Sequence, residues 1–224
     1  MPKPSSLLDG YQYEPGTGRY RNLASGRFVA RTRITDLLGD ALNANERTMT
    51  RTATAFHEGA LDPRDWLNST KLALKREYLQ NAALGAGGWD RLTARDYGRI
   101  GGHLSAEYGR LASMAEQIAA GEVTLPQALN RITMYQGGAR RMYYETEREN
   151  LPEPGRGMTR IARRILGQAE HCFRCVEYYD MGWQPEGVLP VPGAESPCDG
   201  NCRCEIIYRT VTVQAADVLF GTKG

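Results

Sequence analysis

The 224-residue sequence lacks the features that mark several protein classes. No apolar run approaches the length that crosses a bilayer, and the first residues hold no apolar segment of signal-peptide length. The net charge is only +2, which gives little general attraction to nucleic acid. Neither an internal repeat nor a low-complexity tract is found. We therefore expect a soluble globular protein that is synthesised in the cytoplasm and makes no membrane contact.

The motifs of common enzyme classes are also missing. The three histidines, His57, His103 and His171, are widely separated, and none belongs to a nucleophile or metalloprotease motif. No histidine is followed two residues later by glutamate, as a zinc deaminase requires beside its paired cysteines. The glycine clusters match neither a phosphate loop nor a dinucleotide-binding loop. We expect no enzyme activity, and we expect the histidines to be ordinary core or surface residues.

Apolar residues recur at helical spacing through most of the chain. The pattern predicts four long helices with short links, which favours an antiparallel, bundle-like body. Three of these helices have recognisable starts, at Asp62-Pro63, at Thr93 and at Thr124. Two adjacent glycines, Gly137 and Gly138, would bend or interrupt the fourth helix.

Proline and glycine divide the chain into regions. Two prolines and two glycines within residues 151–157 cannot continue a helix, so the helical body must end there. Beyond this point the composition shifts to cysteine, glycine, proline and β-formers, with short strands expected at 206–208 and 210–213. The fold class predicted is mainly α, with long antiparallel helices and a small C-terminal β-rich cysteine and zinc knuckle. The predicted regions are an extended, locally basic N-terminal arm without its own core (1–33), a helical body (34–150) and a C-terminal cysteine-rich β knuckle and tail (151–224).

All five cysteines fall between residues 172 and 204. Cys172 and Cys175 form a C-x2-C pair, the spacing that lets a tight turn aim two thiolates at one tetrahedral ion. Some twenty residues later, a second group contains Cys198, Cys202 and Cys204. In a reducing compartment, clustered cysteines are more often metal ligands than disulfides. The two groups together therefore indicate a structural metal site.

A closed structural zinc site needs four ligands, so one cysteine is spare. We expect Cys202 and Cys204 to point to opposite faces of the chain, whereas Cys198 and Cys202 flank a turn. His171 is a further candidate ligand beside the cysteines. The alternative to a metal site is that the cysteines form disulfides or remain free buried thiols. We predict a structural zinc ion held by Cys172, Cys175, Cys198 and Cys202, with Cys204 as the alternate ligand.

This cysteine-rich tail resembles the C-terminal part of the phage head morphogenesis family, the minor head proteins of the type found in phage Mu. The shared features are the pair Cys172 and Cys175 and the later Cys202-Arg203-Cys204 string, which is followed by a strand-like segment. Family members commonly have His-Pro ahead of that string, where this chain has Pro-Cys-Asp-Gly. The specific resemblance covers about residues 160 to 210.

The resemblance implies a structural minor capsid protein of a tailed bacteriophage, located in the virion. Such a protein acts in head assembly or at the portal and head-tail region, has no enzyme activity, and contacts portal, major capsid or adaptor proteins. One alternative is a virion protein that contacts packaged DNA. It would use the basic arm and five arginines, which are Arg140, Arg141, Arg160, Arg163 and Arg164. A zinc-dependent enzyme or a toxin-like transferase, of the kind sometimes fused to this family, is a third hypothesis.

Overall fold

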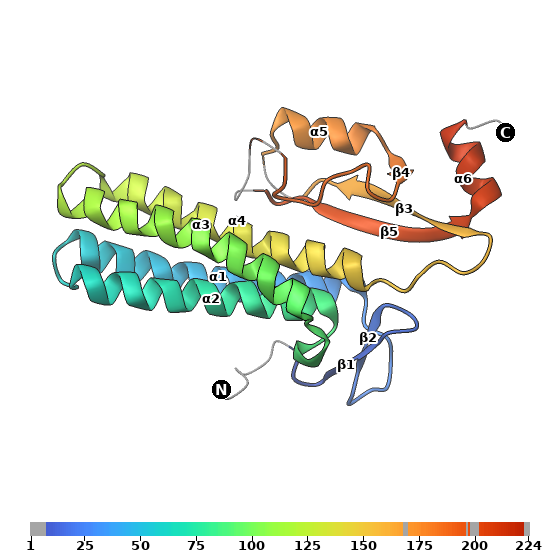
Figure 1. The fold of residues 1–224 in the computed structure, drawn as a ribbon, viewed down its shortest axis with the longest axis horizontal. Helices are drawn as coiled ribbons and strands as arrows, with labels where there is room; N and C mark the ends of the chain where they lie inside the picture. The colour runs from blue at the N-terminus through green and yellow to red at the C-terminus, as the bar shows by residue number, and fades with distance from the viewer. Residues whose placement is uncertain (1–7, 168–169, 196, 198–201, 222–224) are drawn as a thin grey trace. The chain divides into compact units, whose positions relative to one another are not determined.

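The computed structural model describes residues 8–167, 170–195, 197 and 202–221, and in these residues the fold is mainly helical with small antiparallel sheets (Figure 1). The chain divides into two compact units, Met1–Leu151 and Pro152–Gly224, which we call the helical unit and the C-terminal unit. The predicted mainly α fold class is confirmed. None of the described helices has both the length and the apolar character needed to cross a membrane.

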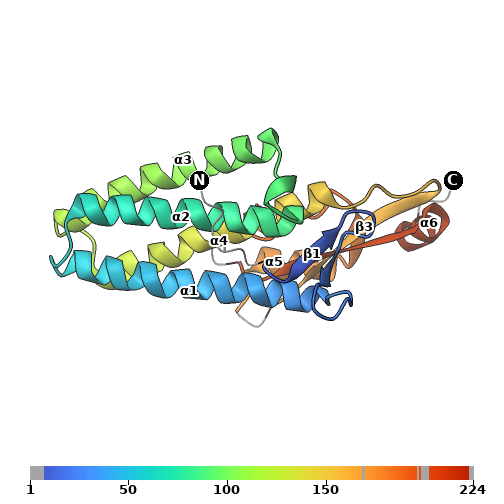
Figure 2. The same cartoon turned by 90° about the horizontal axis from the view of Figure 1, so that it is seen from below.

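Four long helices that run alternately in opposite directions form the helical unit (Figure 2). Helix α2 makes its most extensive contacts with α4 and also packs on α1 and α3. The long helices are α1 (Arg31–His57), α2 (Pro63–Ala86), α3 (Ala94–Ala119) and α4 (Leu125–Asn150), with a 3-10 turn, η1 (Trp89–Arg91), between α2 and α3.

The expected capping residues begin these helices. The side chain of Asp62 accepts a hydrogen bond from the backbone N–H of Arg64 at 2.8 Å and caps α2. At the start of α3, the Thr93 hydroxyl accepts from the N–H of Asp96 at 3.2 Å. The Asp96 carboxylate in turn accepts from the N–H of Thr93 at 2.8 Å, which completes a capping box. Helix α4 likewise follows Thr124.

Small residues allow α2 and α4 to approach closely. A Cβ atom at Gly85 of α2 would overlap the hydroxyl of Thr146, and one at Gly138 of α4 would overlap the hydroxyl of Tyr78. Helix α4 runs unbroken through Gly137 and Gly138, so the expected interruption is absent. Gly85 and Gly138 serve the close packing of these two helices.

Residues 11–22 form a β-hairpin, and the expectation of an extended arm over 1–33 is wrong for this part. Strand β1 (Tyr11–Glu14) pairs antiparallel with β2 (Arg19–Asn22). An isolated bridge from the second strand to Phe28 continues the pairing.

Two tyrosines fasten this hairpin to the helices. Tyr20 is 6% exposed, and its hydroxyl donates a hydrogen bond to the Leu84 carbonyl of α2. The Tyr13 hydroxyl donates to the Asn150 carbonyl at 3.2 Å. The arm therefore shares the core of the helical unit. The prediction failed because the burial of these rings depends on helices far away in the sequence.

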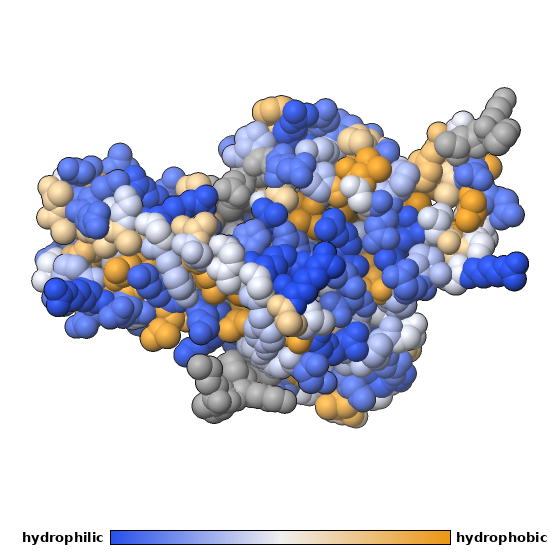
Figure 3. Space-filling model, viewed as in Figure 1, coloured by the Kyte–Doolittle hydropathy of each residue, from blue (hydrophilic) through white to orange (hydrophobic). Residues whose placement is uncertain are grey.

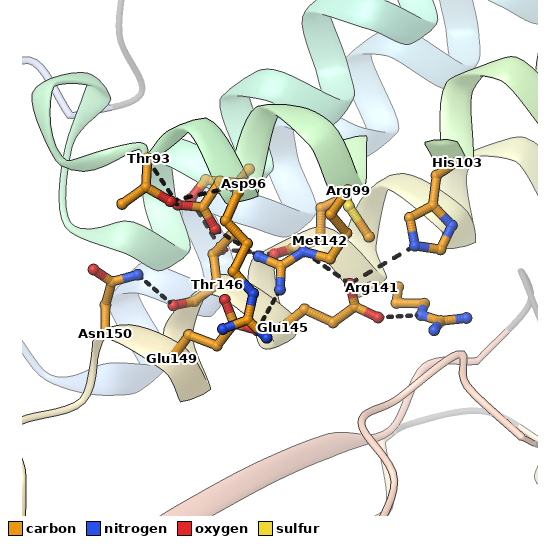
Figure 4. A network of polar contacts seen from close by, with 12 residues as sticks. Thr93, Asp96, Arg99, His103, Arg141, Met142, Glu145, Thr146, Glu149 and Asn150 are labelled. Atoms are coloured by element: carbon orange, nitrogen blue, oxygen red, sulfur yellow. Dashed lines mark hydrogen bonds and ion pairs between the residues drawn. The ribbon is translucent and has the colours of Figure 1, made fainter. Parts of the chain in front are cut away.

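A network of charged side chains joins α3 to α4 (Figure 4). Arg99 of α3 lies 2.7 Å from Asp96, 3.4 Å from Glu145 and 2.5 Å from Glu149. Arg141 also contacts Glu145, at 2.5 Å. Asp96 and Glu145 are only 2% and 6% exposed, so each buried carboxylate has an arginine partner. This network therefore links α3 to α4 through paired charges.

The C-terminal unit is built on a three-stranded antiparallel sheet with β3 in the centre. Helix α5 packs on β3, and α6 contacts all three strands. The predicted strands at 206–208 and 210–213 are one continuous strand, which ends where Thr212 caps α6. Helix α6 buries only Ala216 and exposes Val218 and Leu219 (Figure 3). The elements are β3 (Met158–Ile165), α5 (Phe173–Asp180), β4 (Trp183–Pro185), β5 (Glu205–Thr212) and α6 (Val213–Phe220).

Candidate metal centre

Three of the four described cysteines form a buried group. The Sγ atoms of Cys175, Cys202 and Cys204 all lie within 4.8 Å of one another, and the three residues are 1%, 4% and 0% exposed. We call these three residues the cysteine cluster. Cys172 is partly buried and packs against it. All four described cysteines are free thiols, and the three thiols of the cluster are close enough to hold one metal ion.

The cluster is assembled from two segments. Cys175 lies in the first turn of α5, which follows Cys172 as the N-cap residue, and its N–H donates to the Cys172 carbonyl at 3.0 Å. The positive end of the helix dipole favours a thiolate at this position. Cys202 and Cys204 immediately precede β5, which pairs with β3 along its whole length. Because α5 packs on β3, the sheet brings both segments together.

Cys202 and Cys204 both face the cluster. We expected an extended segment to direct them to opposite faces, and this expectation is wrong. Only neighbouring residues of an extended segment alternate between faces, whereas residues two positions apart, such as Cys202 and Cys204, share one face. Cys204, predicted as the alternate ligand, therefore lies with Cys175 and Cys202. The predicted ligand Cys198 falls outside the described residues.

The distances between the candidate ligand atoms match a tetrahedral zinc site. The Sγ atoms of Cys175 and Cys202 are 3.8 Å apart, and the Nδ1 atom of His171 is 3.6 Å from the Sγ of Cys204. Around a tetrahedral zinc ion, two sulfur ligands are about 3.8 Å apart, and a sulfur and a nitrogen ligand are about 3.6 Å apart. A disulfide would require about 2.05 Å between sulfur atoms. These two distances are therefore those of neighbouring ligands, and the three thiols all lie within 4.8 Å of one another, whereas His171 is linked to this group through Cys204.

His171 is oriented as a metal-binding imidazole would be. Its Nε2 atom lies 2.8 Å from the Gly167 carbonyl oxygen, so Nε2–H donates there and the lone pair of Nδ1 faces Cys204. The same loop is pressed against the Cys202–Cys204 segment, since a Cβ atom at Gly167 would overlap the Arg203 carbonyl oxygen. The sequence signal for His171 was only its place beside Cys172, and we had expected an ordinary core or surface histidine.

The two neighbouring thiols of the cluster share their protons unequally. A hydrogen bond from the Cys204 thiol lowers the pKa of Cys202 to about 5. The backbone N–H groups of Cys204 and Gly193 and the Arg164 guanidinium act in the same direction. The same interaction with Cys202, together with burial, raises the pKa of Cys204. The site thus favours one thiolate before any metal binds. A divalent cation would displace the remaining thiol protons.

Most of the arginines proposed for DNA contact are engaged within the protein. Arg160 and Arg164 are 7% and 0% exposed, and Arg141 pairs with Glu145. In the hairpin region, Arg21 pairs with Glu14 at 2.6 Å. A buried or paired guanidinium is poorly placed to contact a phosphate, so the structure gives the DNA hypothesis little support.

No family model matches this chain, and neither a curated protein nor a solved structure does. The candidate metal centre is therefore defined by its own geometry, in which three buried thiols and one oriented imidazole converge.

Proposed function

We propose that the C-terminal unit is a structural zinc knuckle in which Cys175, Cys202, Cys204 and His171 hold one zinc ion. The observation that supports this most directly is the burial of three thiols at ligand spacing. Three cysteines and one histidine are a common ligand set for structural zinc. Cys172, which was also predicted as a ligand, then serves as the N-cap of α5 beside the centre.

The ligand chemistry favours zinc and a non-catalytic role. Thiolate and imidazole ligands suit zinc, whereas magnesium and calcium prefer oxygen ligands. A catalytic zinc site keeps one position open for water or substrate, but four protein ligands would close this one. The ion would fasten the N-terminus of α5 to the segment before β5, and so hold a small unit whose sheet is only three strands wide.

Metal analysis combined with thermal melting tests the knuckle. Protein purified under reducing conditions should contain one zinc ion per chain, and a chelator should lower the melting temperature of the C-terminal unit. The helical unit supplies an internal control, because its circular dichroism signal should persist after chelation. Metal-free protein with an unchanged melting curve would exclude the knuckle.

We further propose that the chain is a minor head protein of a tailed bacteriophage that docks on portal, capsid or adaptor proteins. The support is the resemblance of its cysteine pattern to that of the head morphogenesis family, since the matching residues Cys175, Cys202 and Cys204 lie together. The C-terminal unit also exposes apolar side chains, which is typical of surfaces that contact other proteins. These include Phe173, Val218 and Leu219, which are 69%, 83% and 54% exposed.

Particle composition tests this assignment. Mass spectrometry of purified phage particles should detect the chain in few copies, and a Cys175→Ser variant should reduce the yield of complete heads. A chain that is absent from particles, and whose loss leaves head assembly unchanged, would contradict the proposal. Tight DNA binding that weakens with rising salt would instead favour the DNA-contacting alternative.

A further inference from the structure

Arg164 of β3 carries a buried charge without a carboxylate partner among the described residues. The residue is 0% exposed. Its Nη2 atom donates a hydrogen bond to the Pro190 carbonyl, and its guanidinium lies 5.4 Å from the centre of the Tyr178 ring. The Nε and Nη1 atoms have no hydrogen-bond partner in the described part of the chain. A guanidinium cannot lose its proton in a protein, so this charge needs a compensating anion.

Arg160 provides a comparison on the same strand. Arg160 and Arg164 are four residues apart on β3 and therefore lie on the same face of the sheet. Arg160 is also buried, but it forms a two-point ion pair with Glu186 at 2.9 and 3.0 Å. One buried arginine of this face thus has its carboxylate, whereas the other has only neutral partners in the part of the chain that the structure describes.

The cysteine cluster can supply the anion for Arg164. Arg164 pairs across the sheet with Ile206, which follows Cys204 by two positions, and Leu166, two positions after Arg164, packs against the cluster. Three thiolates, a neutral imidazole and a divalent zinc ion carry a net charge of −1. One guanidinium balances this charge, whereas four thiolates around zinc would leave an excess of −1 beside Arg164.

We propose that Arg164 is the buried counter-cation of the zinc centre. The guanidinium and the zinc centre together form an electrically neutral core. This inference rests on the proposed zinc knuckle, and it assigns a role to a residue that contributes no ligand. Arg164 stabilises the metal-bound thiolates through its charge, and the thiolates supply the anion that its burial requires. Residues that interact with the ligands of a metal without binding the ion commonly contribute about 10–100-fold to metal affinity.

The test compares neutral and charged replacements of Arg164. Arg164→Gln keeps a donor for the Pro190 carbonyl, Arg164→Met fills the space with an apolar chain, and Arg164→Lys keeps the charge. Zinc affinity is measured by competition with a chromogenic chelator. Cobalt substitution reports the electron density on the sulfur atoms through the energy of the sulfur-to-cobalt charge-transfer band. Arg160→Met is the matched control.

Both neutral variants should bind zinc about 10–100-fold more weakly than the wild type and should shift the charge-transfer band. Arg164→Lys should keep most of the affinity, and Arg160→Met should leave the band in place.

Two outcomes would overturn the role of Arg164. One is wild-type zinc affinity in both neutral variants, and the other is an Arg164→Lys variant that binds as weakly as Arg164→Gln. Wild-type protein that binds no zinc would instead contradict the proposed zinc knuckle. Failure of the role of Arg164 and failure of the knuckle are therefore distinguishable.

Discussion

The Nδ1 atom of His171 lies 3.6 Å from the Sγ atom of Cys204, although 33 positions separate them in the sequence. This contact brings the loop before α5 against the segment before β5. It also places a nitrogen beside Cys204, one of three buried sulfur atoms, at the separation expected for neighbouring ligands of zinc. His171 is therefore the residue that distinguishes a four-ligand centre from a group of buried thiols.

Replacing His171 by alanine should weaken zinc binding by at least about tenfold, because the fourth ligand is lost. The matched control is Cys172→Ser at the neighbouring position. Cys172 is the N-cap of α5, and serine is a favourable N-cap residue, so this variant should keep both its helix and its zinc. Chelator competition measures both affinities. A larger loss in Cys172→Ser than in His171→Ala would assign the fourth position to Cys172.

Adding a methyl group at Gly167 should disturb the metal centre without touching a ligand. The new Cβ atom would collide with the Arg203 carbonyl oxygen, so the loop that carries His171 would have to move away from the Cys202–Cys204 segment. Zinc affinity should fall in Gly167→Ala and remain unchanged in Gly155→Ala, where a Cβ meets nothing within 4 Å. Equal affinities in the two variants would show that this close approach does not position His171.

Glu77 should make the stability of the helical unit depend on pH. This residue is 4% exposed, accepts a hydrogen bond from Asn45, and has its pKa raised by burial from 4.5 to about 8. Between these values the carboxyl is protonated in the folded chain and ionised in the unfolded chain. The contribution of Glu77 to the free energy of unfolding is therefore at its maximum below pH 4.5. It falls as the pH rises to about 8, by on the order of 4 kcal/mol in total.

Glu77→Gln should abolish this dependence, because glutamine stays neutral and can still accept the bond from Asn45. The free energy of unfolding in urea, measured from pH 5 to pH 8.5, should show the variant gaining on the wild type as the pH rises. Glu116→Gln, at an exposed position of α3, is the control and should follow the wild type. A constant difference between Glu77→Gln and the wild type at all pH values would mean that Glu77 is ionised in the folded chain.

Two Gly→Ala variants should change the stability of the helical unit in opposite directions. Gly85→Ala places a Cβ atom against the Tyr143 carbonyl and the Thr146 hydroxyl, and should destabilise the fold by about 1–3 kcal/mol. Gly109→Ala, in an open position of α3, should stabilise it by about 1 kcal/mol through helix propensity. Urea unfolding followed by circular dichroism measures both changes. Stabilisation by Gly85→Ala would contradict the close packing of α2 on α4.

The helices were predictable because their signals are local. Apolar spacing and the capping residues Asp62 and Thr93 indicate helix starts within a few positions, and the structure has the caps at these residues. The hairpin was missed because Tyr13 and Tyr20 are fixed by α2 and α4, which a local pattern cannot reveal.

The candidate site was predictable only in outline. The C-x2-C spacing identifies Cys175, but the expectation that Cys202 and Cys204 separate was wrong, because residues two positions apart in an extended segment share one face. The contribution of His171 depends on the close approach at Gly167, and the unpaired burial of Arg164 depends on the sheet. Both are tertiary features without a sequence motif.

X-ray absorption spectroscopy at the zinc edge tests the central claim most directly. Protein purified under reducing conditions should contain one zinc ion per chain, with three sulfur ligands at about 2.3 Å and one nitrogen ligand at about 2.0 Å. In His171→Ala the nitrogen signal should be lost or replaced by an oxygen ligand. Wild-type protein that binds no zinc, or that binds it through oxygen ligands alone, would contradict the proposed centre.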